Sequence, residues 1–249
     1  YWKNGQGIPL KISNFPEGTA TGIVVDGNDV YVAGWEGDVL DMRNNRAKYW
    51  KNGQEVFLTG ATGAGANAIA VSGPDVYVAG YELLAGKWVA KYWKNGVAVT
   101  LTDVSNNAEA TDIAVVGADV YVSGYDGDIA KCWRNGQLVG PANATAPSYA
   151  FGMAIAGADV YLAGMKDGKP SYWKNGEVFT LTAEEGRSSA IFISGTDLYL
   201  AGEWRMMLDG TQGWYWKNGQ ETILSSSQET WIASSIFVEG NDVYVTGFA

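Results

Sequence analysis

The sequence predicts an all-β fold, a six-bladed β-propeller with four antiparallel strands in each blade. Two repeated motifs and their spacing carry this prediction. Copies of Tyr-Trp-Lys-Asn-Gly, one of them altered, start at Tyr1, Tyr49, Tyr92, Cys132, Tyr172 and Tyr215. Copies of Asp-Val-Tyr-Val-Ala-Gly, or close variants, start at Asp29, Asp75, Asp119, Asp159, Asp197 and Asp242. Successive copies of the first motif are 40 to 48 residues apart, which is the length that a four-stranded blade needs.

Each repeat contains four short runs with the composition of β-strands. In the second complete unit we expect strand A at 67–71, strand B at 75–80, strand C at 88–94 and strand D at 97–102. Asn95-Gly96 joins strands C and D, and Asn-Gly is a strong signal for a tight hairpin because both residues tolerate positive φ. Strand A is apolar on both faces, as in a sheet packed between two others.

The two ends of the chain are each half a blade. The sequence begins with strands C and D and stops after strands A and B. We therefore expect 1–12 to complete the sheet begun by 233–249, which would close the ring and remove exposed sheet edges. The prediction is one domain over 1–249, with blades at 20–59, 66–102, 110–139, 150–182, 188–225 and 233–249 joined to 1–12.

Composition excludes several functional classes. The formal net charge of -10 argues against nucleic acid and anionic membranes, which favour basic surfaces. No run of eighteen apolar residues is present, so we expect no membrane insertion. The chain has no His, which removes the commonest general base and metal ligand. Its single cysteine, Cys132, stands where the other repeats have Tyr, and we interpret it as a buried apolar replacement.

The loops between strands B and C, and those between D and the next strand A, vary among the repeats, whereas the hairpin turns do not. Varied loops on a uniform scaffold are typical of a binding face. Aromatic residues gather there, and such rings stack on sugars or anchor a protein partner; the alternative is that they fill gaps between blades. The predicted ligand-binding residues on these loops are Trp35, Tyr81, Tyr125, Tyr149, Trp204 and Trp231.

Strand A is expected to line a central channel. Its first positions are mostly small residues, and Asp112 is the only charged one. We add Asn67 and Asp112 to the predicted ligand-binding set. A hard cation needs six to eight oxygen ligands, which these residues do not supply. We therefore predict no catalytic residues, no metal and no cofactor. The six motif aspartates, Asp29 to Asp242, are interpreted as turn-stabilising residues that bond nearby backbone N–H groups.

The pair of motifs resembles the tandem propeller repeats of bacterial proteins that are secreted or lie on the cell surface. The resemblance covers the whole chain but implies no activity; a trimmed or engineered chain is the other interpretation. We expect a monomeric, extracellular or cell-surface module that binds a carbohydrate or a protein. The alternatives are a hydrolase or lactonase using the channel near Asn67 and Asp112, and a structural spacer.

Overall fold

The protein is described from a computed structural model that covers residues 1–12, 17–38, 41–60, 63–141, 146–206, 210–224 and 230–248. Within these ranges the chain is all β, apart from one 3-10 turn, η1 (Met42–Asn44). The described part includes no helix long and apolar enough to span a bilayer. The predicted blade ends at 225 and 249 lie outside the described residues.

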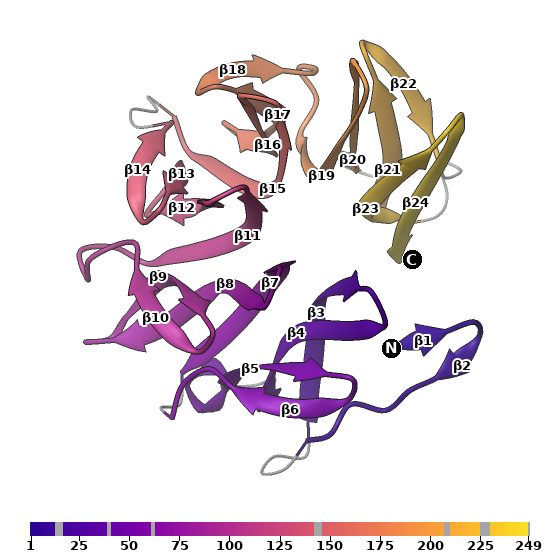
Figure 1. The fold of residues 1–249 in the computed structure, drawn as a ribbon. Helices are drawn as coiled ribbons and strands as arrows, with labels where there is room; N and C mark the ends of the chain where they lie inside the picture. Colours follow the sequence, from indigo (N-terminus) through magenta and orange to yellow (C-terminus); the bar gives the residue numbers. More distant parts are fainter. Residues whose placement is uncertain are drawn as a thin grey trace. The chain divides into compact units, whose positions relative to one another are not determined.

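Five four-stranded sheets follow one another along the chain, as the repeats predict (Figure 1). In each, strands A to D are hydrogen-bonded in chain order, and pairing is antiparallel in sheets 1, 2, 4 and 5. Sheet 1 contains β3 (Glu17–Asp26), β4 (Asp29–Gly37), β5 (Arg46–Lys51) and β6 (Gln54–Phe57). Sheet 2 contains β7 (Ala64–Ser72), β8 (Asp75–Leu84), β9 (Lys87–Lys94) and β10 (Val97–Thr100). Sheet 3 contains β11 (Ala108–Val116), β12 (Asp119–Asp126), β13 (Ile129–Arg134) and β14 (Gln137–Gly140). Sheet 4 contains β15 (Ser148–Ala156), β16 (Asp159–Lys166), β17 (Lys169–Lys174) and β18 (Glu177–Thr180). Sheet 5 contains β19 (Gly186–Ser194), β20 (Asp197–Met206), β21 (Gly210–Lys217) and β22 (Gln220–Ile223).

The two chain ends form separate two-stranded sheets. The N-terminal hairpin pairs β1 (Trp2–Lys3) with β2 (Gln6–Gly7), and the C-terminal hairpin pairs β23 (Ile232–Glu239) with β24 (Asp242–Phe248). The predicted joining of 1–12 to 233–249 in one sheet is therefore not confirmed. The chain comprises two compact units, 1–122 with 133–137 and 123–132 with 138–249.

A set of polar contacts between an Asp of one motif and the Lys and Asn of the other recurs in the sheets, and we call it the clamp. It explains why the two motifs recur together. In sheet 2 the Asn95 side chain accepts from the Val76 N–H at 2.9 Å and donates to Asp75 Oδ1 at 2.7 Å. Lys94 Nζ lies 2.8 Å from Asp75 Oδ2 and 5.2 Å from the centre of the Tyr77 ring. Asp75 thus ties its own hairpin turn to the Lys-Asn-Gly turn across the sheet, rather than bonding to backbone N–H groups of its own turn as expected.

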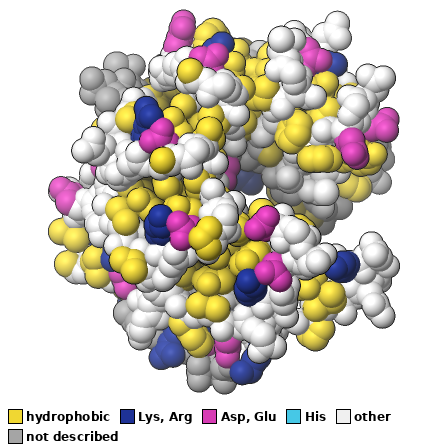
Figure 2. Space-filling view, viewed as in Figure 1, with side chains coloured by type: hydrophobic (Ala, Val, Ile, Leu, Met, Phe, Trp, Pro, Cys, Tyr) yellow, Lys and Arg dark blue, Asp and Glu magenta, His cyan; other side chains and the backbone are white. Residues whose placement is uncertain are grey.

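The same clamp closes one end of every four-stranded sheet. Its Asn residues all have φ between 49° and 52°, apart from Asn218 at 46°, a left-handed conformation that Asn tolerates better than most residues. Oppositely charged side chains accordingly lie next to one another at several points of the face in Figure 2. The members of the other four clamps are Asp29, Lys51 and Asn52; Asp119, Arg134 and Asn135; Asp159, Lys174 and Asn175; and Asp197, Lys217 and Asn218.

Neighbouring sheets bury the same set of positions between them. Between sheets 1 and 2 the core includes Trp93 of strand C, packed with residues of strands A, B and C and with the residue that follows strand D: Ala47, Leu58, Ala64, Ala66, Val76 and Val78. Between sheets 2 and 3 the corresponding Trp133 takes this place. Cys132 is buried as expected, and burial raises the pKa of its thiol to about 12. The motif Trp is therefore a structural residue that seals one sheet against the previous one.

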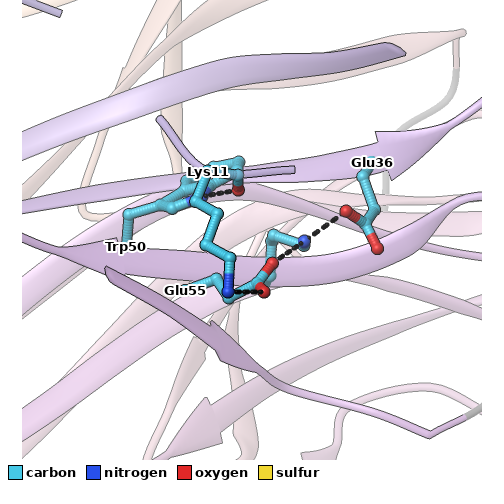
Figure 3. A network of polar contacts seen from close by, with 5 residues as sticks. Lys11, Glu36, Trp50 and Glu55 are labelled. Carbon is cyan, nitrogen blue, oxygen red and sulfur yellow. Dashed lines mark hydrogen bonds and ion pairs between the residues drawn. The ribbon is translucent and has the colours of Figure 1, made fainter. Parts of the chain in front are cut away.

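Sheet 1 also buries a charged network (Figure 3). Lys48 and Glu36 are both fully buried, with Nζ 2.5 Å from Glu36 Oε2 and 2.8 Å from Glu55 Oε2. Lys11 pairs with the same Glu55 at 3.4 Å, and its carbonyl accepts from Trp50 Nε1 at 2.6 Å. The buried Lys48 ammonium thus lies between two carboxylates, and the exposed Lys11 pairs with the second of them; these ion pairs offset part of the cost of burying charge.

Candidate functional site

Strand A carries a β-bulge near its start in sheets 1, 2, 4 and 5. In sheets 1 and 2 the side chain of the extra residue donates a hydrogen bond to the next strand A. Thr21 Oγ1 donates to the Ala66 carbonyl at 2.8 Å, and Asn67 Nδ2 donates to the Ala110 carbonyl at 2.9 Å. The predicted site residue Asn67 therefore ties sheet 2 to sheet 3.

The second predicted polar residue of strand A, Asp112, is also engaged with backbone. Its Oδ1 accepts from the Ile113 N–H at 2.8 Å. Across the described ranges, no three His, Cys, Asp or Glu side chains come close enough to hold a metal ion. Asn67 and Asp112 thus both hydrogen-bond to backbone, and Asp112 belongs to no such group of three in the described part of the chain.

Of the predicted aromatic residues in the first unit, Tyr81 is buried and Trp35 is partly buried. The Tyr81 ring meets Trp88 edge to face, with centroids 5.0 Å apart. Burial, with a smaller contribution from Glu109, raises the pKa of Tyr81 to about 12. Trp35 lies opposite Thr19 on one neighbouring strand and Ala47 on the other. Tyr81 thus offers packing surface rather than an exposed ring.

The structure brings two of the predicted residues together in the second unit. Tyr125 and Tyr149 meet edge to face with centroids 5.1 Å apart, and Tyr149 is parallel to Phe151 at 6.5 Å. Tyr149 Oη donates to Asp128 Oδ1 at 2.5 Å, a bond that raises the pKa of the phenol. We call Tyr125, Tyr149 and Phe151 the aromatic cluster; all three are only partly buried.

A charged pair that the sequence prediction omitted lies beside this cluster. The Arg187 guanidinium carbon is 5.5 Å from the centre of the Phe151 ring, and Arg187 Nε is 3.2 Å from Glu203 Oε1. Glu203 is buried, and its Oε2 has no hydrogen-bond partner among the described residues. The available signal was the repeat itself, because Glu203 occupies the strand-B position that holds Trp35 or Tyr81 in other units.

The last two predicted residues lie elsewhere in the second unit. Trp204 stacks on Trp214 with centroids 4.8 Å apart, and its Nε1 donates to Glu221. Trp231 lines an apolar pocket of about 270 Å³, which we call the C-terminal pocket. The pocket is lined by Gly213, Tyr215, Leu224, Trp231, Ile232, Ala233, Val243, Val245, Thr246 and Gly247.

Comparison with solved structures identifies the architecture. The chain is similar to the β-propeller domain of the Trilobed protease from Pyrococcus furiosus, which is described as having an open velcro topology. The TM-score is 0.54 at 9% identity, covering 95% of this chain and 79% of that one. It is also similar to YjhT, with a TM-score of 0.50 at 10% identity over 93% and 98% of the two chains.

A third similarity is to prolyl endopeptidases, with a TM-score of 0.50 at 13% identity over 83% of this chain. This chain spans about a third of the length of that protein, 34%. No protein-family model and no curated protein sequence matches the chain. Together with the repeated four-stranded sheets, the structural similarities show a β-propeller fold and leave its function open.

Proposed function

We propose that the protein is a non-catalytic binding module whose ligand, a carbohydrate, docks on the aromatic cluster of the second unit. The observation that carries the proposal is the meeting of Tyr125, Tyr149 and Phe151 beside Arg187. Aromatic faces stack on the apolar faces of sugar rings, and a few convergent polar groups fix the orientation of a ligand. Asp128 and Arg187 supply an acceptor and a donor for sugar hydroxyl groups at the two ends of the cluster.

Glycan-array binding, followed by titration calorimetry with the best glycan, tests this function. Tyr149→Ala is expected to weaken binding at least tenfold, because it removes the ring between the other two. Phe179→Ala is the matched control, since its ring stacks on Tyr172 in sheet 4 and is expected to leave the affinity unchanged. If the two variants bind the glycan with equal affinity, the aromatic cluster is not the binding site. Binding of a protein in a parallel pull-down, with no glycan binding, would assign the face to a protein partner instead.

The alternative functions lack a supporting observation of their own. A hydrolase or lactonase using Asn67 and Asp112 is not favoured, because both side chains hydrogen-bond to backbone. A spacer would be indicated by the absence of both glycan and protein binding. In line with the repeats that the sequence resembles, we propose an extracellular or cell-surface location.

We also propose that a monomeric chain forms one ring of six blades, closed by its two ends. The support is a sixth clamp whose members are divided between the ends of the chain. Asp242 begins β24 in the same way as Asp75 begins β8, and Lys3-Asn4 corresponds to Lys94-Asn95. Asn4 already has φ of 51°, as in the complete clamps. Within the described residues, Asp242 has no side-chain partner.

Small-angle scattering tests this closure. A compact single domain of this length has a radius of gyration of about 18 Å. A closed ring is expected to give a value near this and a monomeric mass in light scattering. A clearly larger radius at monomeric mass would contradict closure without bearing on the proposed glycan site.

A further inference from the structure

Each complete clamp contains an Asn-Gly pair in a tight turn. Six such pairs occur in the sequence, and five of them lie in the complete clamps. In sheet 2 the turn has two residues, Asn95 and Gly96, because Lys94 lies opposite Val97. Both turn residues have positive φ, 49° and 81°, and both are exposed. Water therefore reaches this turn from outside, and a Cβ atom added to Gly96 would meet nothing within 4 Å.

An Asn-Gly pair is prone to spontaneous deamidation. Asn is a thermolabile residue, and Gly has no Cβ that would shield its own nitrogen. The Gly96 nitrogen, after losing its proton to a base, attacks Cγ of Asn95. The new N–Cγ bond closes a five-membered succinimide, and Nδ2 takes up a proton and leaves as ammonia. Water then opens the succinimide at either carbonyl, and the product is aspartate or isoaspartate.

The clamp holds the Asn carboxamide by both of its polar atoms. Oδ1 of Asn95 accepts from the Val76 N–H at 2.9 Å, and Nδ2 donates to Asp75 Oδ1 at 2.7 Å. The Asn95 N–H also donates to the Val76 carbonyl at 2.9 Å. Attack requires a specific approach of the Gly96 nitrogen to Cγ, to about 3–3.5 Å, and it requires Nδ2 to be free to leave. Both side-chain hydrogen bonds therefore oppose the reaction, and the bond to Asp75 holds the leaving group.

The same restraint is present in all five complete clamps. The Asn Oδ1 lies 2.9 Å from a strand-B nitrogen in each of them, and Nδ2 lies 2.7–2.8 Å from the Asp carboxylate. Deamidation of Asn95 would place a second carboxylate against Asp75. Isoaspartate would also lengthen the backbone of a two-residue turn, whose length sets the register of strands C and D. Deamidation would thus destroy the clamp in which it occurred.

We infer that the clamped Asn-Gly pairs are latent sites of spontaneous deamidation, and that the clamp Asp suppresses this reaction by restraining the Asn carboxamide. The clamp thus protects the covalent structure of the turn in addition to joining two turns. Each of the five clamps lies within one four-stranded sheet. The inference is therefore independent of glycan binding and of ring closure.

The wild-type protein supplies the first test. The full chain is incubated at mildly alkaline pH, either folded or unfolded in guanidinium chloride. Peptide mass mapping and an isoaspartate-specific assay then follow each Asn-Gly pair. The clamped pairs should react at least tenfold more slowly in the folded protein, which corresponds to a barrier higher by about 1.4 kcal/mol. Equal rates in the two states would overturn the inference.

Substitutions in sheet 2 separate the role of the carboxylate from the rest of the turn. Asp75→Ala frees Nδ2 of Asn95, so its deamidation should become at least tenfold faster. Asn52 of the same molecule keeps its clamp and should react as in the wild type. Asp75→Asn retains a side-chain oxygen that accepts from Nδ2 and should restore most of the protection. Lys94→Met is the matched control, because it removes the cation but leaves both bonds of the carboxamide, and it should change the rate less than threefold.

Two results of these substitutions contradict the inference. In the first, Asn95 of the Asp75→Ala variant reacts no faster than Asn52. In the second, Lys94→Met accelerates the reaction of Asn95 as much as Asp75→Ala does, so that general loosening of the turn sets the rate. Circular dichroism checks that each variant is folded. If Asp75→Ala does not fold, Asp159→Ala repeats the test in sheet 4, where Asn175 is the reporter.

Discussion

Replacing Lys48 by Met is the sharpest test of how the fold tolerates buried charge. Met keeps the length and most of the apolar stem but removes the ammonium group. The change would remove the ammonium that lies 2.5 Å from the fully buried Glu36 carboxylate. Glu55 would lose the Lys48 ammonium and keep its ion pair with Lys11, at 3.4 Å. The ammonium also lies 4.3 Å from the centre of the Phe57 ring, a contact that Met preserves only in part.

The expected loss follows from comparison with an exposed pair. Removing one partner of a buried ion pair costs about 3–5 kcal/mol, because the remaining charge stays buried. Lys51→Met breaks the pair with Asp29, whose side chains are 46% and 39% exposed, and exposed pairs contribute about 0–1 kcal/mol. For a chain of this size, 1 kcal/mol corresponds to about 2–4 °C in Tm. Lys48→Met should therefore lower Tm by about 6–20 °C and Lys51→Met by at most about 4 °C.

Urea unfolding followed by circular dichroism, together with calorimetry, measures both variants. The double variant Lys48→Met/Glu36→Leu removes both fully buried charges and should recover part of the lost stability, since burying neither charge is often close to neutral. A Lys48→Met variant no less stable than Lys51→Met would refute the reasoning. So would a double variant that is much less stable than Lys48→Met alone, because the buried charge of Glu36 would then not be the source of the loss.

Three further predictions concern the repeats. Asn95→Ala loses two side-chain hydrogen bonds and leaves a residue with φ of 49°, so we expect about 2–3 kcal/mol of destabilisation in urea titrations; Asn95→Gly, which accepts this φ, should lose less. Cys132 should be unreactive toward a thiol reagent at pH 8 until the protein unfolds, because burial raises the pKa of its thiol to about 12; rapid reaction of the native protein would contradict its burial. The Lys94 and Asn95 side chains lower the pKa of Asp75 in the folded protein. The ionised Asp75 carboxylate therefore stabilises the fold above its unfolded pKa of about 3.9, and this stabilisation is lost as the pH falls through the lower pKa of the folded state. Tm should be steady from pH 7 to 5 and fall below about pH 4, less steeply in Asp75→Asn.

Local structure could be predicted from the sequence because each repeat contains several independent signals for its strands and turns. Asn95-Gly96 fixes a hairpin by its backbone preferences alone, and alternating Val and Tyr in strand B fix which side chains face the neighbouring sheet. These signals are short-range. Strands A and B of sheet 2 are nonetheless longer than predicted, at Ala64–Ser72 and Asp75–Leu84, since backbone pairing continues past the apolar run into residues with no distinctive composition.

The contacts of individual side chains could not be predicted, because they depend on which neighbour is nearest in space. Tyr81 and Tyr125 occupy the same place in the motif, yet Tyr81 is buried against Trp88 whereas Tyr125 meets Tyr149 of the next sheet. Composition gives no sign of this difference. The Asp75 carboxylate was assigned to its own turn because local bonds are the simplest expectation, and it instead binds Lys94 and Asn95 of another turn.

Comparison of the repeats separates residues that every sheet needs from residues that have a role in one sheet alone. The clamp residues are nearly constant because each clamp must hold two turns together. The residues near the end of strand B differ among the repeats, and the residues that they contact on strand C differ with them. Glu36 pairs with Lys48 in sheet 1 and Glu82 with Lys91 in sheet 2, whereas the corresponding residues of sheet 5, Trp204 and Trp214, stack as two rings. The two residues of each of these pairs belong to the same sheet.

The contact of Arg187 with Phe151 instead joins sheets 5 and 4 and lies beside partly exposed rings. Neither sheet needs this contact to be complete. We therefore place the ligand at this contact and not at the more strongly charged network around Lys48.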